Sequence, residues 1–312
     1  MMFHAQIAQR AFNTPLLVEP SKAMAFLSGL GSRITRRQLR MVGLEVAPED
    51  MAHATLPART GILAGIVTNG ISAQYQRDGQ TPFVLQDDIA VIEISGVLVH
   101  RGAWIEQSSG QTFYEGIAAQ LAAAVADPMV RGIALEIDSF GGEVAGVFDL
   151  ADAIRAARAS KPVWALIAEH AFSAGYALAS QADRIILPRT GAVGSIGVVV
   201  MHADLSGQLS DAGVTVTLIH SGANNVDGNP CAPLPDPVRD RIQAEIDNIR
   251  KLFAETVAAG QGRRQTAEAA LATEAECYRG AEAVAAGLAD DVSDPASAFA
   301  AFADAVHGRG HA

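Results

Sequence analysis

The feature that most constrains this chain is the regular alternation, between residues 88 and 219, of short apolar runs with helical patterns. The apolar runs lack strict polar alternation, which is typical of strands buried on both faces. Such a succession predicts an α/β fold with a mostly parallel sheet, flanking helices and right-handed crossovers. We expect strands at 89–94, 132–137, 163–168, 184–187, 196–201 and 214–219, and helices at 114–125, 144–159, directly after Ser173 and at 205–212.

The rest of the chain differs in character from this region. Residues 1–85 predict a mainly helical N-terminal extension, with helices at 5–12 and 21–30, before a domain at 86–295 and a flexible C-terminal tail at 296–312. After a long loop at 220–235, apolar residues recur every three or four positions and predict an amphipathic helix from Pro237 to Ala259. Its apolar face could serve the core or a subunit contact.

Composition excludes several classes of function. The net charge is −11, and Lys22, Lys161 and Lys251 are the only lysines, which argues against nucleic acid as a ligand. Cys231 and Cys277 provide neither a disulfide framework nor a metal-binding spacing, so we expect reduced thiols, no metal and no cofactor. We see no signal peptide and no apolar run long enough to span a bilayer, which predicts a cytoplasmic protein without membrane association.

Three segments carry residues suited to chemistry. The first is Asp138-Ser-Phe-Gly-Gly-Glu-Val, directly after the predicted strand at 132–137. Gly141 and Gly142 allow the backbone to approach a ligand closely and could donate N–H groups to an oxyanion hole. An ordinary strand-to-helix turn explains the glycine pair equally well.

The second segment contains Ser173, which follows an apolar run and precedes a predicted buried helix. A nucleophilic serine would be placed at such a turn, with the Ala174 amide as the other oxyanion donor. A serine before a helix is also a common N-cap, so the position alone leaves both readings open.

The third segment, Gly191-Ala-Val-Gly-Ser-Ile-Gly-Val, places Ser195 in a glycine-rich turn. It lacks the Gly-Lys-Ser/Thr ending of a phosphate loop and leads into a predicted strand, which argues against nucleotide binding.

Together, and in this order, these segments resemble the S49 family of serine peptidases, the signal-peptide-peptidase A group of the ClpP/crotonase superfamily. Ala182-Asp-Arg-Ile and Ala281-Glu-Ala-Val-Ala-Ala-Gly-Leu-Ala-Asp extend the match over about residues 88–292. The N-terminal segment Phe12-Asn-Thr-Pro-Leu-Leu-Val and the loop His220-Ser-Gly-Ala-Asn-Asn-Val-Asp-Gly-Asn-Pro resemble the phage branch, whose members act as head maturation proteases.

The resemblance implies a ClpP/crotonase-like fold, a homo-oligomer, and Ser173 as nucleophile activated by a neutral lysine, with Ser195 orienting that lysine. The position that matches the lysine is Asn225, which cannot act as a base. His170 and His220 are the alternative bases, ahead of Lys161.

Three functions follow as hypotheses. The first is an endopeptidase that cleaves scaffold or capsid proteins, or itself, in an assembling phage head or its prophage remnant. The second is a catalytically impaired homologue that serves as an assembly component, because Asn225 replaces the lysine. The third, an acyl-CoA enzyme of crotonase type, shares the oxyanion-hole logic but leaves the serine-containing match unexplained.

Overall fold

The computed structural model describes residues 15–18, 82–101, 111–262 and 264–308. Most of the predicted N-terminal extension, including the helices expected at 5–12 and 21–30, lies outside these residues.

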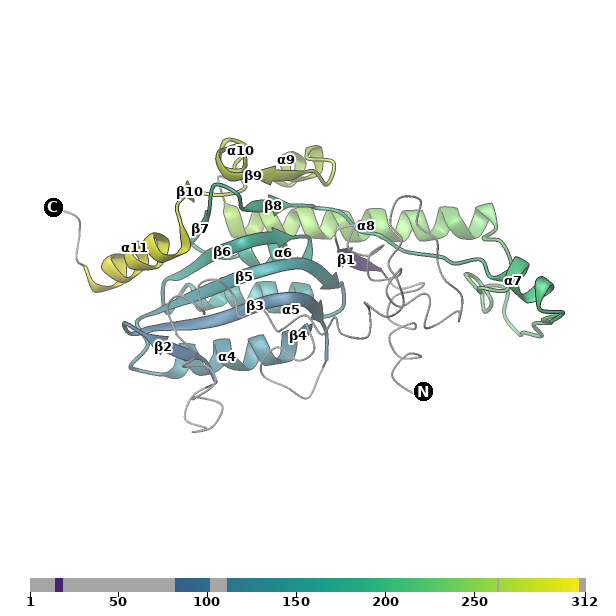
Figure 1. Cartoon of the computed structure of the whole chain (residues 1–312), viewed down its shortest axis with the longest axis horizontal. Coiled ribbons are helices and arrows are strands. Elements are labelled where there is room, and N and C mark those ends of the chain that lie inside the picture. Colours follow the sequence, from purple (N-terminus) through teal and green to yellow (C-terminus); the bar gives the residue numbers. More distant parts are fainter. Residues whose placement is uncertain (1–14, 19–81, 102–110, 263, 309–312) are drawn as a thin grey trace, which may run out of the picture.

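A single, mostly parallel sheet organises the described chain (Figure 1). At its centre, the strand β5 pairs in parallel with β3 on one side and with β6 on the other. These three strands are buried almost throughout, as their continuous apolar runs predict. The α/β class and the mostly parallel sheet with flanking helices are therefore confirmed. The strands are β1 (Leu16–Val18), β2 (Val84–Gln86), β3 (Ile89–Val99), β4 (Gln111–Phe113), β5 (Gly132–Glu143), β6 (Val163–Phe172), β7 (Arg184–Leu187), β8 (Ala192–Gly194), β9 (Cys277–Arg279) and β10 (Asp291–Val292).

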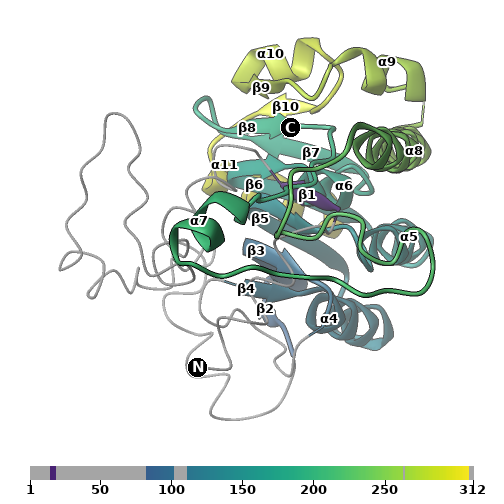
Figure 2. The ribbon, with the colours of Figure 1, turned by 90° about the vertical axis from the view of Figure 1, so that its right-hand side faces the viewer.

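Helices pack on the sheet and close the main core. Figure 2 shows α4, α5 and α8 along one side of the sheet, and α6 packs against β5 and β6 beneath them. Apolar side chains from these helices and from the sheet form one large buried cluster. The helices are α4 (Tyr114–Ala126), α5 (Val147–Ala157), α6 (Ala174–Ala179), α7 (Ser206–Asp211), α8 (Asp236–Gln261), α9 (Ala267–Ala272), α10 (Gly280–Ala285) and α11 (Pro295–His307).

The C-terminal region is not the flexible tail expected from residue 296. Helix α11 begins at Pro295 and continues to His307. Its Phe302 is fully buried and stacks on Trp164 of β6, with the ring centroids 4.8 Å apart. The alanine-rich composition concealed this contact, because two phenylalanines supply most of the apolar area that holds the helix.

Two predicted strands are absent from the positions expected. Residues 214–219 form no strand and are exposed throughout, so this apolar run has no partner strand in the described chain. Residues 196–201 make only one isolated bridge, through Val199, whereas the strand β8 comes earlier, at 192–194. A turn after Ser195, closed by the Gly197 N–H on its carbonyl oxygen, ends β8.

An arm projects from the domain and consists of residues 200–235 with the N-terminal half of α8 (Figure 1). The arm folds back on itself through a hydrogen bond from the Leu205 N–H to the Pro230 carbonyl oxygen, and through an ion pair between Asp227 and Arg241. The C-terminal half of α8 instead buries Phe253 and Val257 in the core. One helix therefore joins core and arm.

Among the helices that the structure describes, none is both long enough and apolar enough to cross a membrane.

Candidate functional site

Ser173 lies at a strained turn between a buried strand and a buried helix. Strand β6 ends at Phe172 and α6 begins at Ala174, so one residue makes the whole change of direction. Ser173 takes φ 54° and ψ −117°, a conformation that L residues rarely adopt. Such strain costs on the order of 1–3 kcal/mol and persists where surrounding bonds impose it. Here the Ser173 N–H donates to the Gly194 carbonyl oxygen at 2.9 Å.

The side chain of Ser173 does not cap helix α6. Its hydroxyl makes no hydrogen bond to the backbone N–H groups of the helix, which excludes the N-cap interpretation. Among the described residues, the Ser173 Oγ has one partner, the Gly197 carbonyl oxygen, at 3.5 Å. This is a long contact for a hydroxyl, so the hydroxyl is held only weakly. Ser173 is nevertheless completely buried.

The glycine pair belongs to strand β5 rather than to a turn, because β5 continues to Glu143 and α5 begins only at Val147. Gly141 has φ +104°, and a Cβ atom there would lie 3.0 Å from the Ser173 Cβ. A Cβ at Gly142 would lie 1.8 Å from the Leu98 carbonyl oxygen. Both positions therefore require glycine.

A hydrogen-bond chain fixes the backbone at Gly141. The Gly141 N–H donates to the Ser139 Oγ at 3.1 Å, and that hydroxyl donates to the Gly96 carbonyl oxygen at 2.7 Å. The Gly141 N–H thus points at Ser139 in this structure. The oxyanion-hole assignment of Gly141, Gly142 and Ala174 stays a prediction.

Ser195 lies next to Ser173 because β8 pairs in parallel with the end of β6, with Phe172 opposite Gly194. Ser195 is buried and has φ +55°, a second strained serine in the same small region. Its N–H donates to the Glu276 carbonyl oxygen at 3.0 Å. The structure therefore brings the predicted nucleophile and the predicted orienting serine together.

The two histidine candidates do not contact the Ser173 hydroxyl. The His170 Nδ1 lies 3.4 Å from the Asp138 Oδ1, and the His170 ring packs against the rings of Phe140 and Phe172. His220 is on the projecting arm, where its Nδ1 lies 3.0 Å from the Gly222 carbonyl oxygen. Neither geometry places an imidazole nitrogen at the nucleophile.

The lysine position of the family is also apart from Ser173. Asn225 is exposed in a turn of the arm, and its N–H donates to the Gly222 carbonyl oxygen at 3.2 Å. Figure 1 shows the arm extending away from β6 and α6. Among the described residues, no hydrogen bond links Asn225 to Ser173.

Lys161 is placed for a structural role. It precedes β6 and so lies at the opposite end of the strand from Ser173. Its Nζ donates to the carbonyl oxygens of Ala124 and Asp127, at 2.6 and 2.5 Å, and thereby ties the end of α4 to the sheet. Burial lowers the pKa of Lys161, and the nearby Asp127 opposes that shift. Of the other lysines, Lys251 is exposed on α8 and Lys22 is outside the described residues.

Sequence reasoning missed the strand that covers this site. Residues Leu16–Val18 form β1, which runs antiparallel to the Gly141–Glu143 end of β5. Leu17 is completely buried in the main core cluster. The available signal was the short apolar run Leu-Leu-Val after Pro15, which is too brief to distinguish a strand from a loop.

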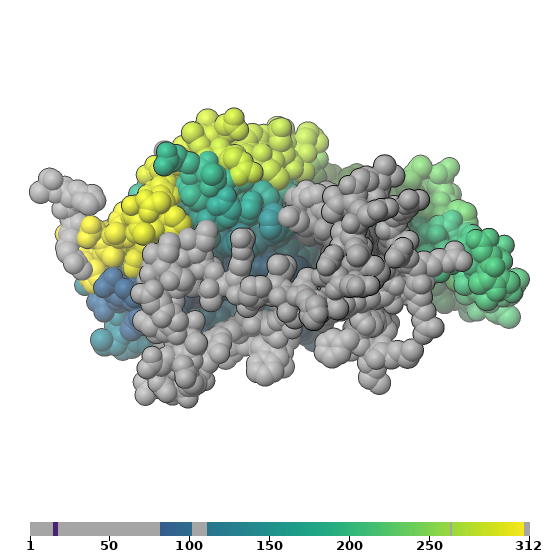
Figure 3. All heavy atoms as spheres, in the orientation of Figure 1, coloured from purple at the N-terminus to yellow at the C-terminus, as the bar shows by residue number. Residues whose placement is uncertain are grey.

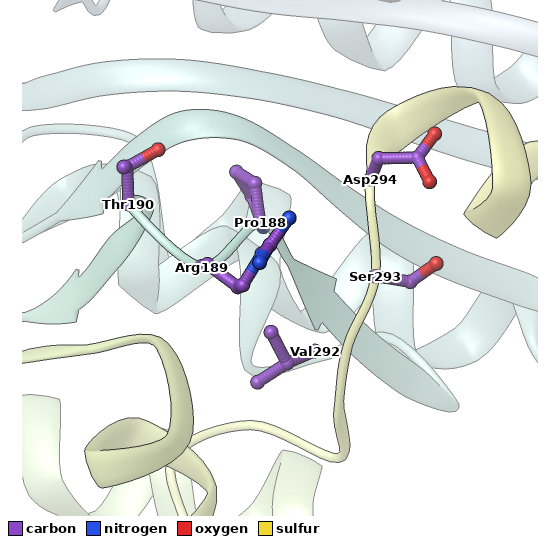
Figure 4. Close-up of a pocket in the computed structure, with 6 residues that line it drawn as sticks. All are labelled: Pro188, Arg189, Thr190, Val292, Ser293 and Asp294. Atoms are coloured by element: carbon purple, nitrogen blue, oxygen red, sulfur yellow. The ribbon is translucent and has the colours of Figure 1, made fainter.

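Two pockets of the described chain lie apart from Ser173, and one of them, on the arm, includes Ser206, Val216 and Cys231 in its wall. The other pocket, of about 580 Å³, lies between the end of β7 and the start of α11, with Arg189, Thr190 and Asp294 in its wall (Figure 4). It shares no residue with the Ser173 region. Within the described ranges, no three His, Cys, Asp or Glu side chains gather as metal ligands would.

Fold and site together define an α/β domain with a buried serine at a strained strand-to-helix turn, beside a glycine on the neighbouring strand. Residues 155–307, which include Ser173 and Ser195, match the family model of peptidase family S49. The chain belongs to this family, as its motifs predict.

Two phage proteins are similar over almost the whole chain. The head-tail preconnector protein GP5 of Enterobacteria phage P21 is 40% identical over 97% of this chain and 58% of its own length. The capsid assembly protease C of Escherichia phage lambda is 39% identical over 97% of this chain and 66% of its own length. This chain therefore spans about three fifths to two thirds of the length of these relatives.

More distant proteins also match. A putative signal peptide peptidase SppA of Enterococcus faecium is 27% identical over 78% of this chain and 69% of its own length. Among solved structures, an enoyl-CoA hydratase from Shewanella pealeana aligns with a TM-score of 0.43, at 12% identity over 72% of each chain.

Proposed function

We propose that this chain is a serine endopeptidase that cleaves scaffold or capsid polypeptides during phage or prophage head assembly, with Ser173 as the nucleophile. The observation that carries the proposal is the conformation of Ser173. A buried serine held at φ 54°, with a hydroxyl that does not cap the following helix, has no evident structural use for that strain. Strain of this kind gathers at functional sites.

The proposed chemistry is acyl transfer. The Ser173 Oγ attacks the carbonyl carbon of the scissile peptide bond as its proton passes to a base, and the leaving amine then takes up a proton. Backbone N–H groups of Gly141 or Gly142 and Ala174 stabilise the oxyanion, once the Gly141 N–H turns from Ser139 to the substrate. Ser195 orients the base. Its burial beside Ser173 supports that role.

The identity of the base divides the proposal into two. Asn225 occupies the lysine position of the family, and the described residues place no lysine or histidine nitrogen within hydrogen-bond distance of the Ser173 hydroxyl. This observation favours, as the second candidate, a catalytically impaired homologue that serves head assembly as a scaffold component.

The proposed partners follow from the phage relatives and from the site. We propose a polypeptide substrate, a homo-oligomer of this chain, and action in the host cytoplasm or in the assembling prohead. A homo-oligomer would give the exposed arm a partner and would allow a base from another subunit to reach Ser173.

The test is covalent labelling of the full chain with a fluorophosphonate, together with cleavage of the cognate scaffold protein. We expect both to be lost in Ser173→Ala and retained in Ser180→Ala. Ser180 is an equally buried serine at the other end of α6, with its hydroxyl bonded to the Ala177 carbonyl oxygen. Equal labelling and cleavage in the parent and Ser173→Ala would disprove the nucleophile assignment.

The same assay separates the two candidates. If the chain is impaired, Asn225→Lys should raise cleavage from background to a measurable rate, because a neutral lysine that reaches Ser173 from the arm of another subunit can accept the serine proton. Robust cleavage by the unaltered chain would exclude the impaired homologue.

A further inference from the structure

Strand β5 loses its pairing with β6 near Ser173, and this leaves the backbone edge of its last residues open to another strand. Strand β6 pairs with β5 as far as Ser139 opposite Ala171. The chain then turns at Ser173 into α6, so β6 no longer accompanies the last residues of β5. On its other side, β5 keeps β3 as partner through Leu98 opposite Gly142. The Gly141–Glu143 edge beside Ser173 is therefore a strand-binding site.

In this structure the chain's own strand β1 fills that edge. Leu16, Leu17 and Val18 lie opposite Glu143, Gly142 and Gly141 in antiparallel register. The far side of β1 is also paired. The Leu16 N–H donates to the Val199 carbonyl oxygen and the Val199 N–H donates to the Leu16 carbonyl oxygen, each at 2.9 Å. A short segment is thus held between two backbone edges.

The placement of Leu17 brings a peptide carbonyl to the serine. The position that a Cβ atom on Gly141 would occupy lies 2.0 Å from the Leu17 carbonyl oxygen. The same position lies 3.0 Å from the Ser173 Cβ, so the Leu17 carbonyl group and Ser173 are close together. The Leu17 side chain is fully buried in the main core. An extended polypeptide with one buried apolar residue beside the nucleophile has the geometry of a bound substrate strand.

We propose that the groove between Gly141–Glu143 and Val199 binds one extended polypeptide strand with an apolar residue at the Leu17 position, and that β1 is its resident occupant, which must leave before another polypeptide enters. This inference rests on the proposed function only for the identity of the incoming strand. Because β1 belongs to the same chain, it competes at an effective concentration on the order of millimolar. A separate polypeptide therefore binds well only after β1 is released.

The test measures binding in the full chain carrying Ser173→Ala, so that nothing is hydrolysed. The probe is a fluorescent peptide with the sequence of residues 13–21, Asn-Thr-Pro-Leu-Leu-Val-Glu-Pro-Ser, and the readout is its fluorescence anisotropy. Leu17→Asp should expel β1, because a carboxylate is costly in an apolar core. We expect this variant to bind the probe at least tenfold more tightly than the same chain with Leu17.

A second variant guards against misfolding of the first. Leu16→Pro removes the N–H that donates to the Val199 carbonyl oxygen and leaves the core residue Leu17 in place. We expect it, too, to gain probe affinity. Pro15→Ala is the matched control, because Pro15 has no N–H to lose and lies just before β1. It should bind like the parent. Thermal unfolding checks that all variants fold.

The peptide side of the groove is tested in the same assay. A probe with Asp at the Leu17 position, or with an N-methyl group at the Leu16 position, should lose at least fivefold in affinity for the Leu17→Asp chain. Equal probe affinity in the parent and in both folded, released variants would overturn the proposal. The proposal would also be overturned if the Leu17→Asp chain bound the two altered probes as tightly as the original probe.

Failure of this inference and failure of the proposed function are distinguishable. Binding that appears only after β1 is released, in a chain whose Ser173 parent cleaves nothing, supports the groove and identifies an impaired homologue. Ser173-dependent cleavage with probe affinity unaffected by Leu17→Asp or Leu16→Pro supports the peptidase and rejects β1 as the occupant.

Discussion

At the scale of residues, the site depends on backbone conformations that the chain adopts at a cost. Ser173 and Ser195 both have positive φ, and they lie side by side where β6 and β8 end. Gly141 on the neighbouring strand has φ +104° and no room for a Cβ atom. These three positions lie in one compact region where the ends of β5, β6 and β8 meet.

Gly141→Ala tests how much of this region depends on a missing side chain. The new Cβ would lie 2.0 Å from the Leu17 carbonyl oxygen. An alanine at φ +104° would also strain the backbone. We expect the free energy of unfolding, measured in urea, to fall by about 3 kcal/mol or more.

Gly213→Ala is the control for Gly141→Ala, because Gly213 also has positive φ but no atom within 4 Å of its Cβ position. It should cost only the strain, about 1 kcal/mol. Equal losses in the two variants would show that contact with β1 contributes nothing.

At the scale of elements, a short local signal marks the start of helix α11. Asp294 is the N-cap residue of α11 and accepts a hydrogen bond from the Ser297 N–H at 3.0 Å, and Pro295 is the first residue of the helix. This is a common arrangement for a helix N-terminus. The helix then covers Trp164 on the face of the sheet opposite α6, so its start affects the packing of that face.

The stability of α11 should depend on pH through Asp294. Hydrogen bonds from the Ser297 side chain and backbone lower the pKa of the Asp294 carboxyl. Because the pKa of Asp294 is lower in the folded state, its carboxylate stabilises the fold at pH values above about 3.9, the pKa of an aspartate in the unfolded chain. This contribution is lost as the pH falls through the pKa of Asp294 in the folded state. We therefore expect the parent to lose stability on acidification below about pH 4 more than Asp294→Asn does.

Asp294→Asn keeps a capping oxygen but cannot titrate in this range, so the difference between the two melting temperatures isolates the carboxylate. At pH 7, Asp294→Ala should melt below both. A difference between parent and Asp294→Asn that does not change between pH 7 and pH 3 would contradict the assignment.

At the scale of the whole molecule, one dense domain carries an arm with an unusual surface. Space-filling atoms in Figure 3 show the arm at one end, beyond the body of the domain. Residues 211–225 are exposed throughout, and Ile219 is 95% exposed. Val214, Val216 and Leu218 are also exposed by more than 40%. Clustered exposed apolar side chains are typical of protein contacts.

We expect this arm to carry the contact of the proposed homo-oligomer. Ile219→Asp should shift the mass measured by size-exclusion chromatography with light scattering towards that of the single chain, because a carboxylate resists burial in an apolar contact. Met129→Asp is the matched control, since Met129 is a large exposed side chain (62%) on the body of the domain. An unchanged mass in Ile219→Asp, with the parent oligomeric, would assign the contact elsewhere.

Much of the fold followed from local pattern. The continuous apolar runs at 89–94, 132–137 and 163–168 predicted the three central strands, since only strands buried on both faces need so many apolar residues in sequence. The same logic failed at 214–219. That run, Val-Thr-Val-Thr-Leu-Ile, is also rich in apolar residues, but it lies on the arm, and pattern alone does not report whether a partner strand exists.

Sequence alone also determined the family, the position of Ser173 at a strand-to-helix turn and the absence of a lysine where the family has one. Only the tertiary structure decided that Ser173 does not cap α6 and that Ser195 lies next to Ser173. The tertiary structure also placed Asn225 on an arm away from the serine, and Leu16–Val18 along the strand edge beside the serine. The physical reason is separation along the chain. Local pattern encodes local conformation, whereas Leu17 and Gly142 are more than a hundred positions apart in the sequence. Their pairing uses backbone N–H and carbonyl groups, which many other short apolar segments could also offer to the edge of β5.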